Sequence, residues 1–224
     1  MELDFWRTRW QNNEIGFHQP YINPYLGYYY GEHGPDAATR QKLRVFVPLC
    51  GKSKDILWLS QNGYAVTGVE CSDIAVEAFF AENNLPVEKQ AQGAHIKYSA
   101  GNIDILQGDF FSLTSEDLGD VTDVFDRASL IALPAEMRKD YAVKMSQLLR
   151  PSTRVLLVTL TYPQHEMDGP PFSVEENEVK VLYEPNFKID KLAAKNTLEL
   201  EPRFKQKGLT SLIETAYKLK RNSN

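Results

Sequence analysis

The chain has 224 residues, 42% of them hydrophobic and 25% charged, which is typical of a soluble globular protein with one substantial domain. Its formal net charge of -5 at pH 7 excludes a general attraction to nucleic acid. Residues 1–7 contain no apolar signal core, and no apolar run is long enough to span a membrane, so we expect a cytoplasmic protein without nucleic-acid or membrane partners.

The first forty residues are rich in aromatic side chains and precede the first predicted core strand. Trp6 and Trp10 are one helical turn apart, so they share a face of a predicted helix. Two interpretations are open: a helix that packs on the core, which the spacing alone favours, or a lid over residues 1–40 that covers a bound ligand. Further aromatic residues of this segment are Phe5, Phe17, Tyr21, Tyr25, Tyr28, Tyr29 and Tyr30.

The next segments predict a strand, a ligand loop, a helix and a second strand. Residues 43–47 form an apolar run that leads into the loop Cys50-Gly51-Lys52-Ser53. A helix is predicted over 55–61, and a second strand over 64–70 ends in Glu70. A carboxylate at the tip of this strand can accept both hydroxyl groups of a ribose. The pattern therefore predicts a cofactor of the nucleotide type.

The predicted ligand loop differs from both common phosphate-binding loops. Phe46 stands where a Walker loop requires a glycine, five residues before Gly51, and the dinucleotide fingerprint Gly-x-Gly-x-x-Gly is absent. A loop with one glycine suits a ligand without phosphates at this point, such as S-adenosylmethionine. The rival interpretation, a nucleotide-dependent oxidoreductase, requires the missing fingerprint. Lys52 is accordingly interpreted as a helix-start residue.

Helices and strands continue to alternate along the rest of the chain. Such alternation predicts a mostly parallel sheet with helices on both faces, whose ligands bind beyond the carboxyl ends of the strands. Helices are predicted over 72–84, 134–149 and 174–182, strands over 95–99, 102–106, 121–125 and 154–161, and antiparallel strands from 188 onward. The residues expected at the ligand edge are Leu49, Gly51, Glu70, Asp109 and Arg127.

Several of these residues also have an ordinary structural interpretation. Gly108-Asp109 is a common turn pair, and Arg127 follows Asp126, with which it could form a surface ion pair. We favour a functional Arg127, because a guanidinium group stays charged and presents forked donors to an anionic acceptor. Cys50 and Cys71 have no Cys or His cluster around them, so we expect no metal; a disulfide is conceivable, but a reducing compartment favours free thiols.

Six blocks of sequence occur in an order that matches a known family across most of the chain. They are Phe5-Trp6 through Trp10, Gly16-Phe17-His18-Gln19, Val47-Pro48-Leu49-Cys50-Gly51-Lys52, Gly68-Val69-Glu70, Phe125-Asp126-Arg127 and Gly169-Pro170-Pro171-Phe172. The chain resembles the thiopurine S-methyltransferase family of the bacterial type. The resemblance implies a class I methyltransferase: a three-layer, Rossmann-like α/β fold with a mostly parallel seven-stranded sheet, an antiparallel C-terminal strand and an N-terminal lid. We expect a single domain over residues 1–224, and a monomer.

The resemblance also implies roles for individual residues. Arg127 is the residue expected to act in catalysis, near both cofactor and acceptor. Asp109-Phe110 stands where the vertebrate sequence has Ser-Ile. The cofactor-binding residues would be Trp6, Trp10, Leu49, Gly51, Glu70, Asp109, Phe110 and Arg127, and the acceptor-binding residues Phe17, Arg127 and Arg203.

The implied reaction moves the methyl group of S-adenosylmethionine to the sulfur of an aromatic or heterocyclic thiol, such as a thiopurine, and gives S-adenosylhomocysteine. Such thiols ionise readily, so Arg127, with Arg203, would favour the thiolate without a dedicated general base. The expected partner is a small-molecule thiol. Two alternatives are detoxification of selenium or tellurium compounds by methylation, and a non-catalytic protein that binds a thiol or a metalloid.

Overall fold

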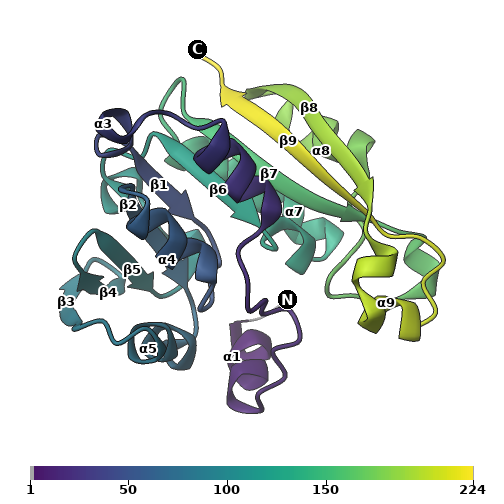
Figure 1. Cartoon of the computed structure of the whole chain (residues 1–224), viewed down its shortest axis with the longest axis horizontal. Helices are drawn as coiled ribbons and strands as arrows, with labels where there is room; N and C mark the ends of the chain where they lie inside the picture. The colour runs from purple at the N-terminus through teal and green to yellow at the C-terminus, as the bar shows by residue number, and fades with distance from the viewer. Residues whose placement is uncertain (1–2, 224) are drawn as a thin grey trace. The chain divides into compact units, whose positions relative to one another are not determined.

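The computed structural model describes residues 3–223 and divides after Phe125 into two compact units, each of which is described by itself (Figure 1). Met1, Glu2 and Asn224, which the expected domain includes, lie outside the described residues. The division falls within one strand, β6 (Asp123–Arg127), so that its last two residues belong to the second unit.

The first unit is built on strands in the order β3-β4-β5-β2-β1-β6. Strand β1 pairs in parallel with β2 and β6, and β2 pairs in parallel with β5, whereas β4 is antiparallel to both β3 and β5. β1 and β2 are buried over almost their whole length, as expected of parallel strands that are covered on both faces. The bounds are β1 Arg44–Val47, β2 Ala65–Glu70, β3 Glu88–Gln92, β4 His95–Ala100 and β5 Ile103–Gln107.

Two capped helices follow the first two strands of the unit. The side chain of Ser53 accepts a hydrogen bond at the start of α4 (Lys54–Gln61), and that of Ser72 does so at the start of α5 (Asp73–Glu82). Because each helix starts just after a parallel strand ends, these helix N-termini lie at the ligand-binding edge of the sheet. The other helices are α1 Leu3–Gln11, α2 Pro24–Leu26, the π-helix η1 Gly27–Glu32, α3 Ala37–Arg40, η2 Phe110–Ser112 and α6 Ser115–Leu118.

The second unit combines three antiparallel strands with helices. Strand β9 (Ile213–Arg221) pairs with both β7 (Arg154–Thr161) and β8 (Phe187–Asn196). Arg138 on α7 is buried and pairs with Glu178 on α8, with 2.7 Å between Nε and Oε1. The helices are η3 Leu130–Ala132, α7 Ala135–Leu148, η4 Gln164–Glu166, α8 Glu176–Tyr183, η5 Leu198–Leu200 and α9 Pro202–Gln206.

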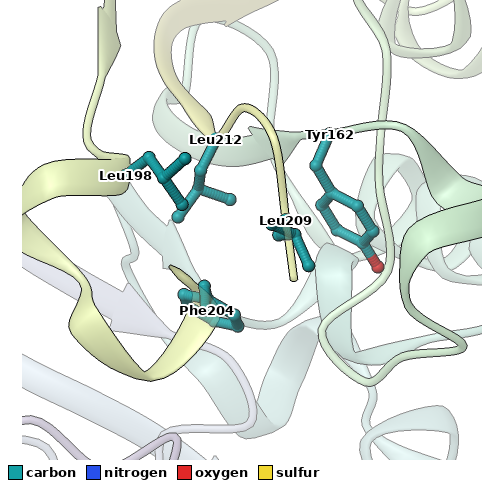
Figure 2. Close-up of a cluster of buried hydrophobic side chains, with 5 residues drawn as sticks. All are labelled: Tyr162, Leu198, Phe204, Leu209 and Leu212. Carbon is teal, nitrogen blue, oxygen red and sulfur yellow. The ribbon is translucent and has the colours of Figure 1, made fainter. Parts of the chain in front are cut away.

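A cluster of buried side chains fixes the segment between β8 and β9. Figure 2 shows three leucines and a phenylalanine of this segment grouped together, with Tyr162, which follows β7, at one side of the group. The hydroxyl of Tyr162 donates a hydrogen bond to the carbonyl of Pro171 at 2.6 Å, which ties in the Gly-Pro-Pro-Phe loop. The members of the cluster are Tyr162, Leu198, Phe204, Leu209 and Leu212.

The core strands lie within two residues of their predicted ranges, and the predicted hairpin is present as β4 and β5. Residues 3–223 contain nine strands, against seven expected. Part of the difference is β3, whose Glu-Lys-Gln-Ala-Gln sequence is polar and largely exposed. Such an edge strand lacks the apolar alternation on which strand prediction depends. No helix in the described part of the chain is long and apolar enough to cross a membrane.

Candidate active site

The carboxylate of Glu70 lies at the end of β2 and is held by backbone donors. Its Oε2 accepts a hydrogen bond from the N–H of Gly51 at 2.8 Å, and its Oε1 accepts one from the N–H of Ser72 at 2.9 Å. The Cys71 thiol donates to the same Oε1 at 3.3 Å. Burial raises the pKa of Glu70, while these donors act in the opposite direction. A carboxylate offers about four lone-pair directions, so Glu70 retains acceptor capacity, and a ligand hydroxyl can displace the weak thiol donor.

The loop after β1 is folded tightly against the end of β2. The N–H of Cys50 donates to the carbonyl of Val69 at 2.9 Å. Leu49 and Gly51 both have a positive φ, of 43° and 51° respectively. For leucine this conformation is costly, and such strain gathers at functional sites. A Cβ on Gly51 would lie 3.0 Å from Cζ2 of Trp10, so the missing side chain permits a close approach.

Helix α1 therefore places an aromatic side chain directly on this loop. Trp10 is 7% exposed, and its ring meets that of Phe17 edge-on, with 5.5 Å between centroids. Trp6 meets the same Phe17 ring in the same way, also at 5.5 Å. The first unit thus brings together three of the four predicted aromatic site residues, Trp6, Trp10 and Phe17, with Trp10 in contact distance of the predicted ligand loop.

The end of β5 lies beside the end of β2, because Glu70 and Gln107 are partners in the parallel register. Gln107 Nε2 donates to the carbonyl of Cys71 at 3.1 Å. Nε of Arg7, on α1, donates to the same carbonyl at 3.5 Å. The carbonyl of Cys71, which follows β2, thus accepts hydrogen bonds from side chains of both β5 and α1.

Asp109 and Phe110 form the turn after β5. Oδ1 of Asp109 accepts a hydrogen bond from the N–H of Phe111 at 3.0 Å, so the ordinary turn role of Gly108-Asp109 is present. The ring nitrogen Nε2 of His95 is 3.0 Å from the Asp109 carbonyl. Phe110 is 2% exposed, so its ring belongs to the core of the first unit.

The lysine and cysteine side chains of the two strand-end loops interact with neighbouring groups. Lys52 Nζ pairs with Glu82 Oε1 on α5 at 2.6 Å. Burial raises the pKa of both Cys50 and Cys71, and the nearby charge of Glu70 raises it further, so both remain unreactive thiols at neutral pH. Both cysteines are free.

Among residues 3–223 there is no group of three or more His, Cys, Asp or Glu side chains that could hold a metal ion.

Arg127 belongs to the second unit, where it ends β6. It is half-buried, and its charge lowers the pKa of Glu214 against the raising effect of burial. Ala128 follows with a φ of 65°, a strained conformation for alanine. Asp126 is buried and accepts a hydrogen bond from the Tyr141 hydroxyl at 2.8 Å, and burial raises its pKa to about 6.

Arg203 lies on α9 and pairs with a neighbouring carboxylate. Its Nε is 3.2 Å from Oε2 of Glu201, and its guanidinium carbon lies 4.6 Å from the centre of the Phe204 ring. The charge of Glu201 also acts on Glu214. Four residues of the second unit are thus linked by their charges, and we call them the arginine–glutamate cluster: Arg127, Glu201, Arg203 and Glu214.

Sequence reasoning identified the two arginines of this cluster but neither glutamate. Glu201 could have been identified from the sequence, because it lies only two residues from the predicted site residue Arg203. Glu214 had no such signal, because the effect of Arg127 on its pKa depends on the folding of segments far apart in the sequence. Gln107 was missed for the same reason, since its partner Cys71 is 36 positions away.

Comparison with known proteins relates the whole chain to one family. The family model described as thiopurine S-methyltransferase (TPMT) matches residues 1–222. The thiopurine S-methyltransferase of Pseudomonas entomophila is 45% identical over 221 residues, which cover 99% of this chain and 100% of that protein. The corresponding enzyme of Nitrosospira multiformis is 44% identical over 219 residues, 98% of each chain.

Solved structures show the same fold at low identity. A SAM-dependent methyltransferase from Anabaena variabilis superposes with a TM-score of 0.66 at 16% identity, over 98% of this chain and 95% of that one. The 1,6-didemethyltoxoflavin-N1-methyltransferase of Burkholderia thailandensis, solved with S-adenosylhomocysteine, gives 0.64 at 14% identity, over 98% and 87% of the two chains. These likenesses confirm the predicted class I α/β methyltransferase fold. With the close relatives above, they establish that the chain is a methyltransferase of the thiopurine S-methyltransferase family.

Proposed function

We propose that this enzyme transfers the methyl group of S-adenosylmethionine to the sulfur of an aromatic or heterocyclic thiol, such as a thiopurine, and releases S-adenosylhomocysteine. The observation that carries the proposal is the arrangement of Glu70, Gly51 and Trp10 at the ends of β1 and β2. A buried acid beside a single-glycine loop under an aromatic ring suits a nucleoside ligand without phosphates. The bound cofactor supplies an activated methyl group.

The first unit would hold the cofactor through residues on three strand ends. Glu70 accepts the ribose hydroxyl groups, while Leu49 and Gly51 bring backbone close to the amino acid moiety. Asp109 and Phe110 border the adenine through the turn that they form. Trp6 and Trp10 act as part of the lid over residues 1–40, where they attract the sulfonium charge by cation–π contact.

The acceptor would be held by Phe17, Arg127 and Arg203. A guanidinium group stays charged at neutral pH and donates to a thiolate, so Arg127 stabilises the ionised sulfur and aligns it with the methyl carbon. Arg203 assists from α9, and Phe17 offers an apolar edge to a planar ring. No general base is required, because an aromatic thiol ionises near neutral pH. The further expectations are a single domain over residues 1–224, a cytoplasmic monomer, no metal, and no nucleic-acid or membrane partner.

Titration calorimetry with S-adenosylmethionine and with NADH, followed by a methyl-transfer assay with 6-mercaptopurine, tests the proposal. We expect micromolar binding of S-adenosylmethionine alone, and methylated product. Binding of NADH instead would favour the oxidoreductase. Cofactor binding without product would direct the assay to selenium and tellurium acceptors, and no product there would leave a non-catalytic binding protein.

Arg127 is tested separately by replacement with lysine and with alanine. Arg127→Lys keeps the charge but loses the forked donors, so we expect it to recover only part of the kcat/KM that Arg127→Ala loses, with the cofactor still bound. Turnover of 6-mercaptopurine at the wild-type rate by Arg127→Ala would refute the role of Arg127.

A further inference from the structure

Glu166 joins two loops of the second unit through two hydrogen bonds from a single residue. Its Oε1 accepts a hydrogen bond from the Thr210 hydroxyl at 2.7 Å, and its Oε2 accepts one from the Thr210 N–H at 2.8 Å. Glu166 ends η4, in the loop after β7, whereas Thr210 lies between α9 and β9. The two donors lower the pKa of Glu166, so the carboxyl group is ionised at neutral pH and both hydrogen bonds are charge-assisted.

On one side, this contact holds the turn that carries Arg203. Leu209, the residue before Thr210, is buried with Phe204 in the cluster of Figure 2. The N–H of Leu209 donates to the carbonyl of Phe204 at 3.2 Å, and the N–H of Lys207 donates to that of Arg203 at 3.3 Å. Arg203 and Thr210 thus belong to one hydrogen-bonded turn, so a displacement of Thr210 is transmitted to Arg203.

On the other side, the contact starts from a loop that is fixed to the segment after Arg127. The N–H of Phe172 donates to the carbonyl of Ile131 at 2.7 Å, and Ile131 is four residues after Arg127. Within the loop, Oε1 of Gln164 accepts a hydrogen bond from the N–H of Ser173 at 2.9 Å. The loop that carries Glu166 is therefore tied both to itself and to the end of β6.

We propose that Glu166 is a positioning residue of the acceptor site, which by holding Thr210 keeps Arg203 at a fixed place relative to Arg127. The inference rests on the proposed function of these two arginines. Because both hydrogen bonds are exposed to solvent, they contribute little to the stability of the unit. They can still fix the distance between the two loops. Glu166 acts through Arg203 and does not itself touch the acceptor.

Kinetics of matched variants test this inference. Glu166→Gln keeps the size of the side chain but replaces one of the two acceptor oxygens by an amide group, so one hydrogen bond is lost. Glu199→Gln is the control, because Glu199 accepts equally short hydrogen bonds, at 2.7 Å, from Lys205 within the segment between β8 and β9. We expect Glu166→Gln to lower kcat/KM for 6-mercaptopurine about tenfold, as misplaced substrate-binding groups do. Its Tm and its affinity for S-adenosylmethionine should change little, and Glu199→Gln should behave as wild type.

Substitutions at the other end of the contact, together with a double variant, locate the effect. Thr210→Ser keeps the hydroxyl donor and should behave as wild type, whereas Thr210→Val removes it and should lose part of kcat/KM. If Glu166 acts only through Arg203, adding Glu166→Gln to Arg203→Lys causes little further loss, because residues in one network are not additive. Losses that multiply would overturn the inference, as would wild-type kinetics in Glu166→Gln or an equal loss in Glu199→Gln.

A measurement without turnover keeps this inference distinct from the proposed function. The Nε atom of Arg203 is buried, so its N–H resonance, assigned by its disappearance in Arg203→Lys, reports the surroundings of this side chain. The resonance should shift or broaden in Glu166→Gln but not in Glu199→Gln. An unchanged resonance in Glu166→Gln would refute the role of Glu166 even if the wild type methylates thiols. A wild type that methylates no thiol would refute the proposed function, while the resonance would still decide whether Glu166 fixes Arg203.

Discussion

Glu70 is a buried charge whose surroundings are already arranged for an anion. Burial opposes ionisation, and the N–H groups of Gly51 and Ser72 favour it, so the carboxylate is held in a fixed direction at the end of β2. A group that is oriented before the ligand arrives loses little entropy on binding. The same contacts mean that a substitution here affects both the ligand and the loop.

Glu70→Gln and Glu70→Ala should both weaken binding of S-adenosylmethionine. Loss of a charged hydrogen-bond acceptor costs about 1.5–3 kcal/mol, so we expect about a tenfold to hundredfold rise in Kd. Calorimetry measures the change, and Glu77→Gln, at an exposed residue paired with Lys89, is the control. Unaltered affinity in Glu70→Ala would refute the ribose role.

Asp126 makes the stability of the protein depend on pH. Its pKa is about 6 in the folded protein, above the ordinary value of 3.8 for an aspartate side chain. The folded state therefore binds more protons between these values, so the free energy of unfolding falls as pH rises from about 4 to about 6. At neutral pH the buried charge lowers stability by about 3 kcal/mol, from about 1.4 kcal/mol per pKa unit.

Asp126→Asn should remove this part of the pH dependence. An asparagine oxygen still accepts the hydrogen bond of Tyr141, so packing is kept while the titration is lost. Urea unfolding at pH 4.5 and at pH 7 should show a smaller loss of stability in the variant than in the wild type. Because other carboxyl groups titrate in both proteins, the difference between the two proteins is the measured quantity. Equal slopes would contradict the prediction.

Helix α1 packs closely against the loop after β1 because Gly51 has no side chain. Gly51 and Gly101 both have a positive φ, of 51° and 60°, but a Cβ would meet Trp10 at Gly51 and nothing within 4 Å at Gly101. An alanine at either position costs about 1 kcal/mol in the left-handed conformation. Gly51→Ala must in addition displace Trp10.

Gly101→Ala is thus a matched control for Gly51→Ala. We expect Gly51→Ala to lower Tm further, to shift the tryptophan fluorescence and to weaken binding of S-adenosylmethionine. Gly101→Ala should lower Tm alone. Equal effects of the two substitutions on cofactor affinity would show that the contact between α1 and the loop has no part in binding.

The same elements show what local sequence can predict. β1 and β2 were predictable because they are short apolar runs, and Glu70 because it follows such a run directly. α7 was predictable from its apolar stripe, of which Tyr141, Met145 and Leu148 are buried. β3 was not, because its pairing with β4 rather than its own side chains makes it a strand. The π-helical turn Gly27–Glu32 likewise has no local signal that distinguishes it from an α-helix.

Local patterns predicted single site residues better than their combinations. Trp6 and Trp10 share a helix face by spacing, but their common contact with Phe17 depends on the turn after α1. Arg127 lowers the pKa of Glu214 only because distant segments fold together, which no local pattern reports. The resemblance to a family identified Arg127 and Arg203 as site residues. The charged residues that act on them could be identified only from the folded structure.

The whole chain was predicted to be one domain over residues 1–224, and ligand-linked unfolding tests this. A ligand that binds only the folded state stabilises it by about 2.7 kcal/mol at a concentration 100 times its Kd. For a chain of this size, each kcal/mol raises Tm by roughly 2–4 °C. We expect calorimetry to show a single transition that S-adenosylmethionine shifts upward by several degrees, and that NADH leaves in place.

The chain divides after Phe125 into two compact units, so the result that would contradict a single domain can be stated in advance. The residues proposed to hold the cofactor, apart from Arg127, all lie in the first unit, whereas Arg203 and Glu214 lie in the second. Two transitions, of which only one responds to S-adenosylmethionine, would mean that the units unfold separately and would contradict the single domain. In Glu70→Ala the ligand-induced shift should shrink, because that variant loses affinity. A full shift in Glu70→Ala would mean that the stabilising ligand binds elsewhere.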